Sequence, residues 1–176
     1  MQRVPVLSRV SRKLKEWYFL DTVSSDDLVL EIGCGDGWAG RYLRDRGVDR
    51  VVGIDANPPA AIVGDIREWR SLGLTAESFD VIVAFEVLEH VNCMADCFAL
   101  LKPGGRLLVT SPWPSADRIL EKLEQWKLNQ PRTSPHIYLT YFKETPDFEI
   151  ARMWRPLWLS QWCIFRRRPN PAIPKR

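Results

Sequence analysis

The chain has 176 residues, of which 45% are hydrophobic and 27% charged, as is typical of one globular domain with a sizeable core. No apolar run approaches the roughly 20 residues that span a bilayer, which argues against a transmembrane helix. The net charge of +3 comes largely from basic residues near the two ends. We interpret that charge as solvated terminal charge, although it leaves binding to nucleic acid open.

The cysteines indicate a reducing compartment. They form no CxxC pair, and the first ten residues lack the apolar stretch of a signal peptide. We therefore expect free thiols and a cytoplasmic location. We expect one domain over residues 1–168, and a disordered tail over 169–176, where three prolines and two basic residues stand.

The elements alternate between strands and helices. Val10, Leu14, Trp17 and Tyr18 have helical spacing and predict an amphipathic lead-in helix within residues 1–23 that could act as a lid. After it we expect strands at 28–32, 50–54, 79–85 and 106–110, and helices at 38–46 and 94–101. The Lys-Pro-Gly-Gly sequence at 102–105 is predicted to turn into the strand at 106.

Two further features follow the strand at 106–110. Ser115 is predicted to cap a helix whose Ile119, Leu120, Leu123 and Trp126 share a face, and a proline-bearing loop at 129–135 should end it. The runs at 148–154 and 159–166 can then pair as an antiparallel hairpin at the sheet edge. Because the earlier strands are continuous apolar runs, we expect a doubly wound α/β fold with a mostly parallel sheet.

The stretch VLEIGCGDGWAG, residues 29–40, carries the chemistry. A buried strand runs into Gly33, Gly35 and Gly37, which allow a sharp turn and the close approach of a ligand. A dinucleotide fingerprint would need a third glycine where Trp38 stands, and an acid at Glu31 would repel a pyrophosphate. A ligand with a sulfonium and an α-amino group would be attracted by Glu31 and Asp36, which favours S-adenosylmethionine.

Two more acids follow at suitable places. Asp55 ends the strand in VVGIDAN, where a carboxylate can accept both hydroxyl groups of a ribose. Asp65, in IVGDI, is placed to meet the adenine amino group.

Taken together, these motifs resemble the class I S-adenosylmethionine-dependent methyltransferases, especially the type 11 group. Five stretches occur in the order that the family shows: EIGCGDG, GID, GDI, FDVIVAFEVLEHV and LKPGGRLLVTSP. The resemblance covers about residues 17–114 and implies a Rossmann-like, seven-stranded sheet whose last strand is antiparallel. It also implies S-adenosylmethionine as cofactor and S-adenosylhomocysteine as product.

Carried over position by position, the resemblance implies roles for single residues. The glycine loop with Cys34 would line the methionine part, Asp55 with Ala56 would hold the ribose, and Asp65 with Ile66 would frame the adenine. Phe85 and Glu86 would lie beside the reacting methyl group. His90 and His136 stand where the family often shows histidines. Catalytic candidates are therefore His90, His136 and Glu86, and each of the two histidines has a purely structural alternative.

One departure from the family pattern and one alternative remain. Only residues 56–64 separate Asp55 from Asp65, where the family usually has a full helix, and Pro58-Pro59 forbids one. The adenine pocket is therefore predicted to be open on that side. His90, Cys93 and Cys97 share helical spacing but lack a fourth zinc ligand, so we predict no metal.

The sequence thus predicts a methyltransferase that acts on a small molecule or on a glycan or lipid intermediate, with a homodimer as one possibility. A non-catalytic cofactor-binding partner subunit is the main alternative, and an RNA or protein methyltransferase is the weaker one. Eight tryptophans could line an acceptor pocket, with Trp113 the best placed, but large aromatics are more often core residues.

Overall fold

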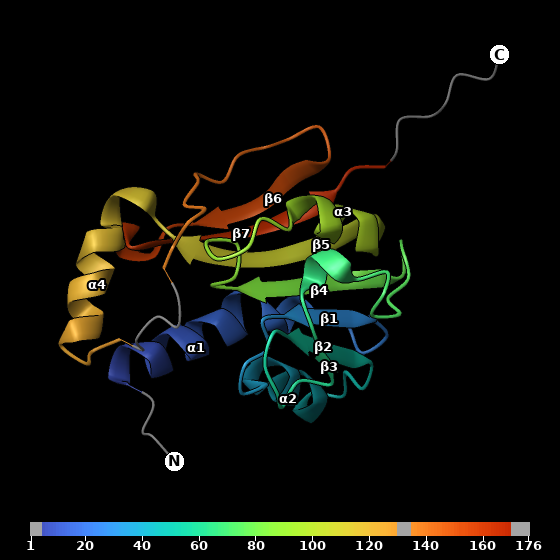
Figure 1. Cartoon of the computed structure of the whole chain (residues 1–176), viewed down its shortest axis with the longest axis horizontal. Coiled ribbons are helices and arrows are strands. Elements are labelled where there is room, and N and C mark those ends of the chain that lie inside the picture. Colours follow the sequence, from blue (N-terminus) through green and yellow to red (C-terminus); the bar gives the residue numbers. More distant parts are fainter. Residues whose placement is uncertain (1–4, 130–134, 170–176) are drawn as a thin grey trace.

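A seven-stranded mixed sheet forms the centre of the protein, in a computed structural model that describes residues 5–129 and 135–169. The strand order is β3-β2-β1-β4-β5-β7-β6 (Figure 1). The strands are β1 (Val29–Ile32), β2 (Val51–Asp55), β3 (Ile62–Val63), β4 (Phe79–Phe85), β5 (Leu101–Pro112), β6 (Phe148–Trp154) and β7 (Ser160–Arg167). The first five pair in parallel, and β7 lies antiparallel between β5 and β6, so the predicted fold class is confirmed.

Both faces of the sheet are buried, as the continuous apolar strands predict. Alternate residues of one strand enter two separate cores: Leu30 and Ile32 lie in one, and Val29 in the other. The first core includes buried residues of α3 (Met94–Leu100), and the second includes residues of α2 (Trp38–Asp45) and of the segment 18–20. Because successive side chains of a strand point to opposite faces, helices cover both faces of the sheet, which is the doubly wound arrangement.

The amino-terminal segment is part of the core. Helix α1 spans Val6–Tyr18, and a 3-10 turn, Leu20–Thr22, follows it. The predicted helix is therefore confirmed, but it begins four residues before Val10. At most 2% of each of Tyr18, Phe19 and Leu20 is exposed, so the end of this segment is not a detachable lid.

Helices α1 and α4 (Asp117–Gln125) lie at the end of the sheet where β4 and β5 terminate (Figure 1). The amide of Leu7 donates to the carbonyl of Leu128 at 3.3 Å, and the Ser8 hydroxyl donates to Asn129 at 3.0 Å. Helix α4 contains no buried residue, and half or more of Ile119 and Trp126 is exposed. The expected apolar face of this helix thus exists but is not packed in the core of the described residues.

Two local expectations are wrong. Ser115 does not cap α4: Ala116 occupies that position, and the Ser115 hydroxyl contacts the Tyr141 hydroxyl at 3.0 Å. Residues 102–105 do not precede the strand either, because β5 already begins at Leu101. Between Phe79 and Val81 of β4 the partner on β5 shifts from Leu101 to Arg106, and Gly104 takes a φ of 79° there. The glycine turn is a bulge inside a longer strand.

Some expectations concern residues outside the described ranges, namely most of the loop 129–135 and of the tail 169–176. Among the described helices, none combines the length and apolar character needed to cross a bilayer. The hairpin of β6 and β7 is confirmed, with β6 at the sheet edge.

Candidate functional site

The glycine loop after β1 is built as the sequence predicts. Gly33, Gly35 and Gly37 have φ values of 67°, 50° and 70°, in the left-handed region that favours glycine. A Cβ at Gly33 would stand 2.5 Å from a methyl group of Val87, whereas one at Gly35 would meet nothing within 4 Å. The first glycine therefore allows close packing, and the second leaves one side of the loop open.

Asp55 fixes this loop to the end of β2. Its carboxylate accepts one hydrogen bond from the Gly35 amide and one from the Asn57 amide, each at 2.9 Å. A carboxylate has about four acceptor positions, so two remain for hydroxyl groups. Ala56 follows directly and is exposed. The arrangement is compatible with the predicted ribose contact.

Glu31 points from β1 toward α2 and is 6% exposed. Its carboxylate accepts from the Gly40 amide at 3.0 Å, which ties β1 to α2 near the start of the helix. Burial raises the pKa of Glu31 to about 7, although the Gly40 amide and the Arg44 guanidinium oppose this shift. Glu31 therefore has a structural role in joining β1 to α2, in addition to the predicted attraction for a cationic ligand.

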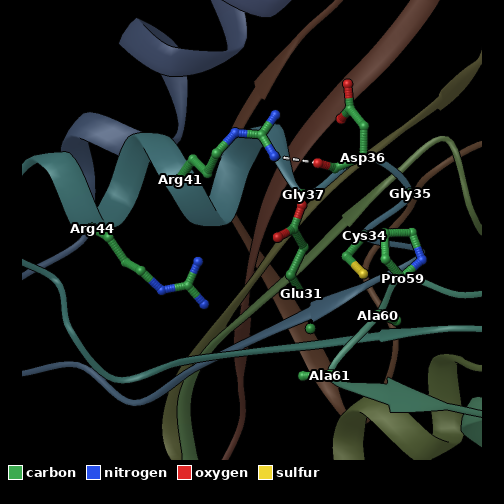
Figure 2. A pocket seen from close by; sticks show the side chains of 11 residues that line it. Glu31, Cys34, Gly35, Asp36, Gly37, Arg41, Arg44, Pro59, Ala60 and Ala61 are labelled. Carbon is green, nitrogen blue, oxygen red and sulfur yellow. Dashed lines mark hydrogen bonds between the residues drawn. The ribbon is translucent and has the colours of Figure 1, made fainter.

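The other loop side chains differ in exposure. Asp36 faces outward and pairs with Arg12 of α1 at 3.1 Å. Cys34 is buried next to Gly53, and burial raises the pKa of its thiol to about 11, so the thiol stays protonated. In Figure 2 the Arg41 side chain reaches back to the backbone carbonyl of Asp36.

A cavity of about 300 Å³ lies between the loop and the segment after β2 (Figure 2). The glycine loop, Glu31 and the arginines of α2 line one side of it, and Pro59, Ala60 and Ala61 line the other. Residues 56–61 form no helix, as the two prolines predict. The cavity therefore adjoins the short segment that replaces the family's usual helix.

Asp65 and Ile66 begin a 3-10 turn after β3. The Asp65 carboxylate accepts from the Arg67 amide at 2.9 Å and pairs with the Arg67 guanidinium, which lowers the pKa of Asp65. Ile66 is buried in the core. An adenine amino group would share the Asp65 carboxylate with Arg67, so the predicted adenine contact stays a prediction.

Phe85 and Glu86 stand at the end of β4, as predicted. The Glu86 carboxylate accepts from the Thr110 hydroxyl at 2.7 Å and pairs with the Lys15 ammonium of α1 at 3.0 Å. Glu86 has a φ of 56°, which is unusual for a residue other than glycine. Its amide donates to Thr110, and this network holds the strained backbone.

The two histidines come together, although 46 positions separate them in the sequence. Their ring centroids are 5.0 Å apart. Glu89, which the sequence interpretation did not include, lies with them: one ligand atom from each of Glu89, His90 and His136 falls within 4.8 Å of the others. The spacing Glu-His in EVLEH is the local signal, but only the fold brings His136 to it.

Glu89 is completely buried, and neither carboxylate oxygen has a hydrogen-bond partner among residues 5–129 and 135–169. Burial, together with the negative charge of Glu86, raises the pKa of Glu89 to about 9. Cys93 and Cys97, the two thiols weighed with His90 as zinc ligands, are fully buried in the core and are not part of this cluster.

Comparison with known proteins decides the family. A methyltransferase domain family matches residues 8–148 of the chain. The chain belongs to this methyltransferase family. The predicted resemblance is thereby confirmed, and family membership gives S-adenosylmethionine as the cofactor.

Two methyltransferases are similar to the chain in sequence. The chain is 32% identical over 142 residues to a Mycolicibacterium smegmatis protein named "Probable S-adenosylmethionine-dependent methyltransferase", covering 69% of this chain and 52% of that one. It is 34% identical over 106 residues to the rat mitochondrial ubiquinone biosynthesis O-methyltransferase, covering 47% and 30%. The chain thus spans about half the length, or less, of these curated relatives.

The methyltransferase fold is also found among solved structures. An S-adenosylmethionine-dependent methyltransferase from Archaeoglobus fulgidus superposes with a TM-score of 0.59 at 15% identity, covering 90% of this chain and 94% of that one. A Pyrococcus horikoshii protein gives a TM-score of 0.67 at 16% identity, covering 92% and 91%. These likenesses concern the fold alone.

The residues present fit the cofactor. Gly35 leaves the loop open on one side, and Asp55 keeps acceptor capacity for hydroxyl groups. Asp36 is half exposed beside them and carries the negative charge that a sulfonium or ammonium group attracts. The candidate cofactor site therefore comprises the glycine loop, Asp55 and the adjoining cavity.

Proposed function

We propose that this protein transfers the methyl group of S-adenosylmethionine to a small-molecule acceptor, a class in which we include glycan and lipid intermediates. Family membership supports the activity, and the name of the rat ubiquinone biosynthesis O-methyltransferase supports a small acceptor.

One contact carries the proposal most directly. The hydrogen bond of 2.9 Å from the Gly35 amide to the Asp55 carboxylate joins the loop after β1 to the end of β2. It holds a flexible glycine loop in one position and aims a carboxylate at the place where a ribose would lie. A loop held in this way is organised for a nucleoside before the ligand binds.

Methyl transfer requires the protein mainly to position the two reactants. S-adenosylmethionine supplies an electrophilic methyl group, and most of the rate can come from holding the acceptor in line near it. In the proposed site the glycine loop and Asp55 bind the donor. Phe85 and Glu86, at the end of β4, border the place where the acceptor must lie. Lys15 of α1 fixes the Glu86 carboxylate.

A non-catalytic partner subunit is the second candidate. The short segment 56–61 favours it, because the helix that usually covers the cofactor on that side is replaced by an exposed proline-containing loop. A pocket with less cover would bind the cofactor more weakly. Measured affinity therefore separates the two candidates.

The basic carboxyl-terminal run gives little support to an RNA-binding role. Arg166, Arg167 and Arg168 each pair with a glutamate, namely Glu149, Glu77 and Glu144. At most 2% of the Arg167 side chain is exposed. These ion pairs hold the three arginine side chains against neighbouring glutamates. Strong, salt-dependent RNA binding would nevertheless restore the RNA methyltransferase alternative.

The test is calorimetric titration of the purified chain with S-adenosylmethionine and S-adenosylhomocysteine. Asp55→Asn keeps the shape of the side chain but removes the charge, and Asp49→Asn makes the same change at an exposed residue before β2. We expect dissociation constants on the order of micromolar for the native chain and Asp49→Asn, and binding at least about tenfold weaker for Asp55→Asn. Absence of binding by the folded native chain would move the partner-subunit alternative to first place.

A further inference from the structure

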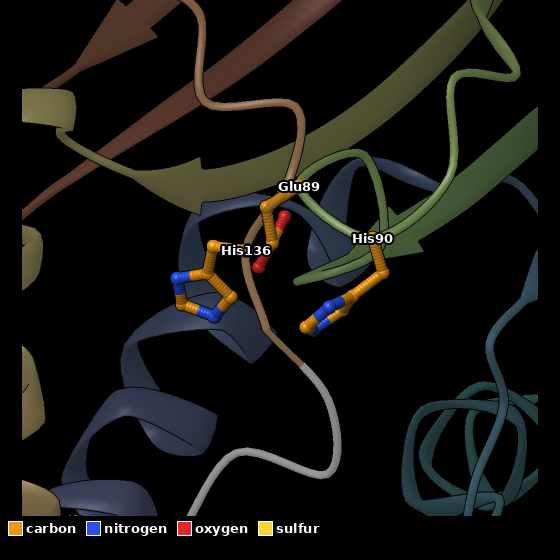
Figure 3. Close-up of side chains that lie close together, drawn as sticks. All are labelled: Glu89, His90 and His136. Carbon is orange, nitrogen blue, oxygen red and sulfur yellow. The ribbon is translucent and has the colours of Figure 1, made fainter.

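A cluster of three side chains lies beside the proposed methyl-transfer position and is not used by the cofactor site. Glu89 and His90 follow β4 on the turn after Glu86, and His136 lies on the segment that leads from α4 to β6. Figure 3 shows the Glu89 carboxylate between the two imidazole rings. Each residue offers a ligand atom within 4.8 Å of the others.

The backbone holds the two segments together. The amides of Ile137 and Tyr138 both donate to the carbonyl oxygen of Glu89, at 2.8 and 3.0 Å. These bonds bring His136 beside the turn that carries Glu89 and His90. Main-chain contacts therefore hold the two segments of the cluster side by side.

Both histidines are oriented by a second partner. Nδ1 of His136 contacts the Asp117 carboxylate at 2.6 Å, and Nδ1 of His90 contacts the carbonyl oxygen of Pro135 at 3.2 Å. Metal-ligating histidines almost always make such a bond to a carboxylate or a carbonyl through one ring nitrogen. The bond fixes the ring and presents Nε2 as the ligand atom. A carboxylate on one ring and a carbonyl on the other reproduce that arrangement twice.

Glu89 gives the strongest support for a cation site. Its carboxylate is fully buried, and neither oxygen has a hydrogen bond of good geometry to a described residue. The Ser111 hydroxyl and a backbone amide favour its charged form only in part, and the neighbouring Glu86 is also acidic. The nearby Lys15 ammonium is bonded to Glu86. A buried carboxyl group normally has hydrogen-bond partners or binds a metal, and a bound cation would keep Glu89 ionised despite its burial.

We propose that Glu89, His90 and His136 bind a divalent transition-metal ion, and that this ion holds a hydroxyl group of the methyl acceptor. Two imidazoles and one carboxylate suit Zn²⁺, Co²⁺, Fe²⁺ or Mn²⁺. Ligands about 2.1 Å from an ion stand at most about 4.2 Å apart, so small side-chain rotations complete the site. Three protein ligands leave positions open, as in catalytic metal sites.

The role in catalysis rests on the proposed function. The acceptor hydroxyl loses its proton to water when it binds the ion, because a metal lowers the pKa of a bound hydroxyl group. Its oxygen then forms a bond to the methyl carbon while the bond from that carbon to sulfur breaks. The electron pair of the broken bond stays on sulfur, giving neutral S-adenosylhomocysteine and a methyl ether. The substrate class is therefore an alcohol or a phenol.

Metal binding can be tested without cofactor or activity. The full chain, stripped with a chelator, is titrated with Co²⁺ while the visible absorption of the bound ion is recorded, and melting is measured with and without Zn²⁺. The ligand variants are Glu89→Gln and His136→Asn, and Asp117→Asn tests the orienting carboxylate. Two controls are Glu121→Gln, an exposed glutamate on α4, and Cys97→Ala, which removes a thiol near the turn.

We expect one Co²⁺ per native chain, a rise in melting temperature with Zn²⁺, and at least about 100-fold weaker binding in both ligand variants. Asp117→Asn should weaken binding by about 10- to 100-fold, and both controls should bind as the native chain does. Absence of Co²⁺ binding and of a Zn²⁺ shift would overturn the proposal, as would unchanged binding in folded Glu89→Gln. Loss of binding in Cys97→Ala alone would point to a thiol site instead.

The outcomes separate this proposal from the proposed function. A chain that binds Co²⁺ but no S-adenosylmethionine has the metal site without the activity. A chain that binds S-adenosylmethionine but no Co²⁺ keeps the proposed function and loses the metal site. Where both bind, Glu89→Gln should retain cofactor affinity and lose O-methylation, which a purely structural role of Glu89 does not predict.

Discussion

The Lys15 ammonium of α1 lies 3.0 Å from the Glu86 carboxylate at the end of β4. The same ammonium stands 5.3 Å from the centroid of the Phe85 ring and 5.8 Å from that of Trp162. Only 8% of the Lys15 side chain is exposed. The amino-terminal helix thus delivers a buried cation to the place where the methyl acceptor should lie.

Removing this cation should affect turnover more than cofactor binding. Lys15→Met keeps most of the apolar stem but leaves Glu86 with Thr110 and without its cationic partner, so we expect a loss of about tenfold or more in kcat/KM for the acceptor. Affinity for S-adenosylmethionine should change less than about threefold. Lys13→Met is the matched control, because the Lys13 side chain is 77% exposed. Equal losses of turnover and cofactor affinity would contradict a role at the acceptor side.

The start of the chain should also be needed for folding. Phe19 is fully buried between the rings of Tyr18, Phe85 and Trp162. Phe19→Ala should lower the free energy of unfolding by about 3–5 kcal/mol in urea denaturation. Val10→Ala, at a half-exposed position of α1, should change it by less than about 0.5 kcal/mol. Similar small effects in both variants would mean that α1 is a separable lid after all.

Much of this fold could be predicted because its signals are local. Continuous apolar runs mark strands buried on both faces, and the period of two in β1 assigns Leu30 and Val29 to different cores. The glycine loop, Asp55 and the hairpin of β6 and β7 were found for the same reason. Each of them is marked by residues that lie close together in the sequence.

The remainder depends on contacts between distant segments. Nothing near Leu101 indicates that β5 begins before the glycine turn, since the pairing with Phe79 of β4 decides it. Glu89 is one of 22 acidic residues in the sequence, and it stands out only once its burial and the approach of His136 are known. Serine is a favoured residue at a helix N-cap, but Ala116 occupies the N-cap of α4, and the Ser115 hydroxyl contacts the Tyr141 hydroxyl instead.

Substituting two glycines of the loop should have different effects on stability and on cofactor binding. Gly33→Ala combines a φ of 67° with a contact of 2.5 Å to Val87, so we expect a loss of about 2–4 kcal/mol of stability. Gly35→Ala has a φ of 50° and no atom within 4 Å of the new Cβ, so about 1 kcal/mol is expected. Its methyl group would project on the open side of the loop and should weaken S-adenosylmethionine binding by about tenfold.

Urea denaturation and calorimetry on the same preparations separate these effects. Gly33→Ala should be partly rescued by Val87→Ala, with a coupling energy of about 1 kcal/mol, because the second change removes the clashing methyl group. Gly35→Ala should gain nothing from Val87→Ala. A rescue of both variants would show that the loop moves as a unit and would refute the separate roles.

Glu31 should make stability depend on pH. Burial raises the pKa of Glu31 from 4.5 to about 7 in the folded chain, so the folded state binds a proton that the unfolded state has released. The contribution of this group is therefore full below pH 4.5 and is lost as the pH rises through 7. With 1.36 kcal/mol for each pKa unit, a rise from 4.5 to about 7 corresponds to a full loss of about 3 kcal/mol.

Glu31→Gln removes this titration while its amide oxygen can still accept from the Gly40 amide. The stability of the native chain relative to Glu31→Gln should therefore fall by about 2–3 kcal/mol between pH 4.5 and pH 8, measured by urea denaturation at several pH values. Asp45→Asn, at an exposed residue of α2, should show little of this trend. A difference that stays constant with pH would mean that Glu31 is ionised throughout. Its charge would then be stabilised by Arg44 and the Gly40 amide despite its burial.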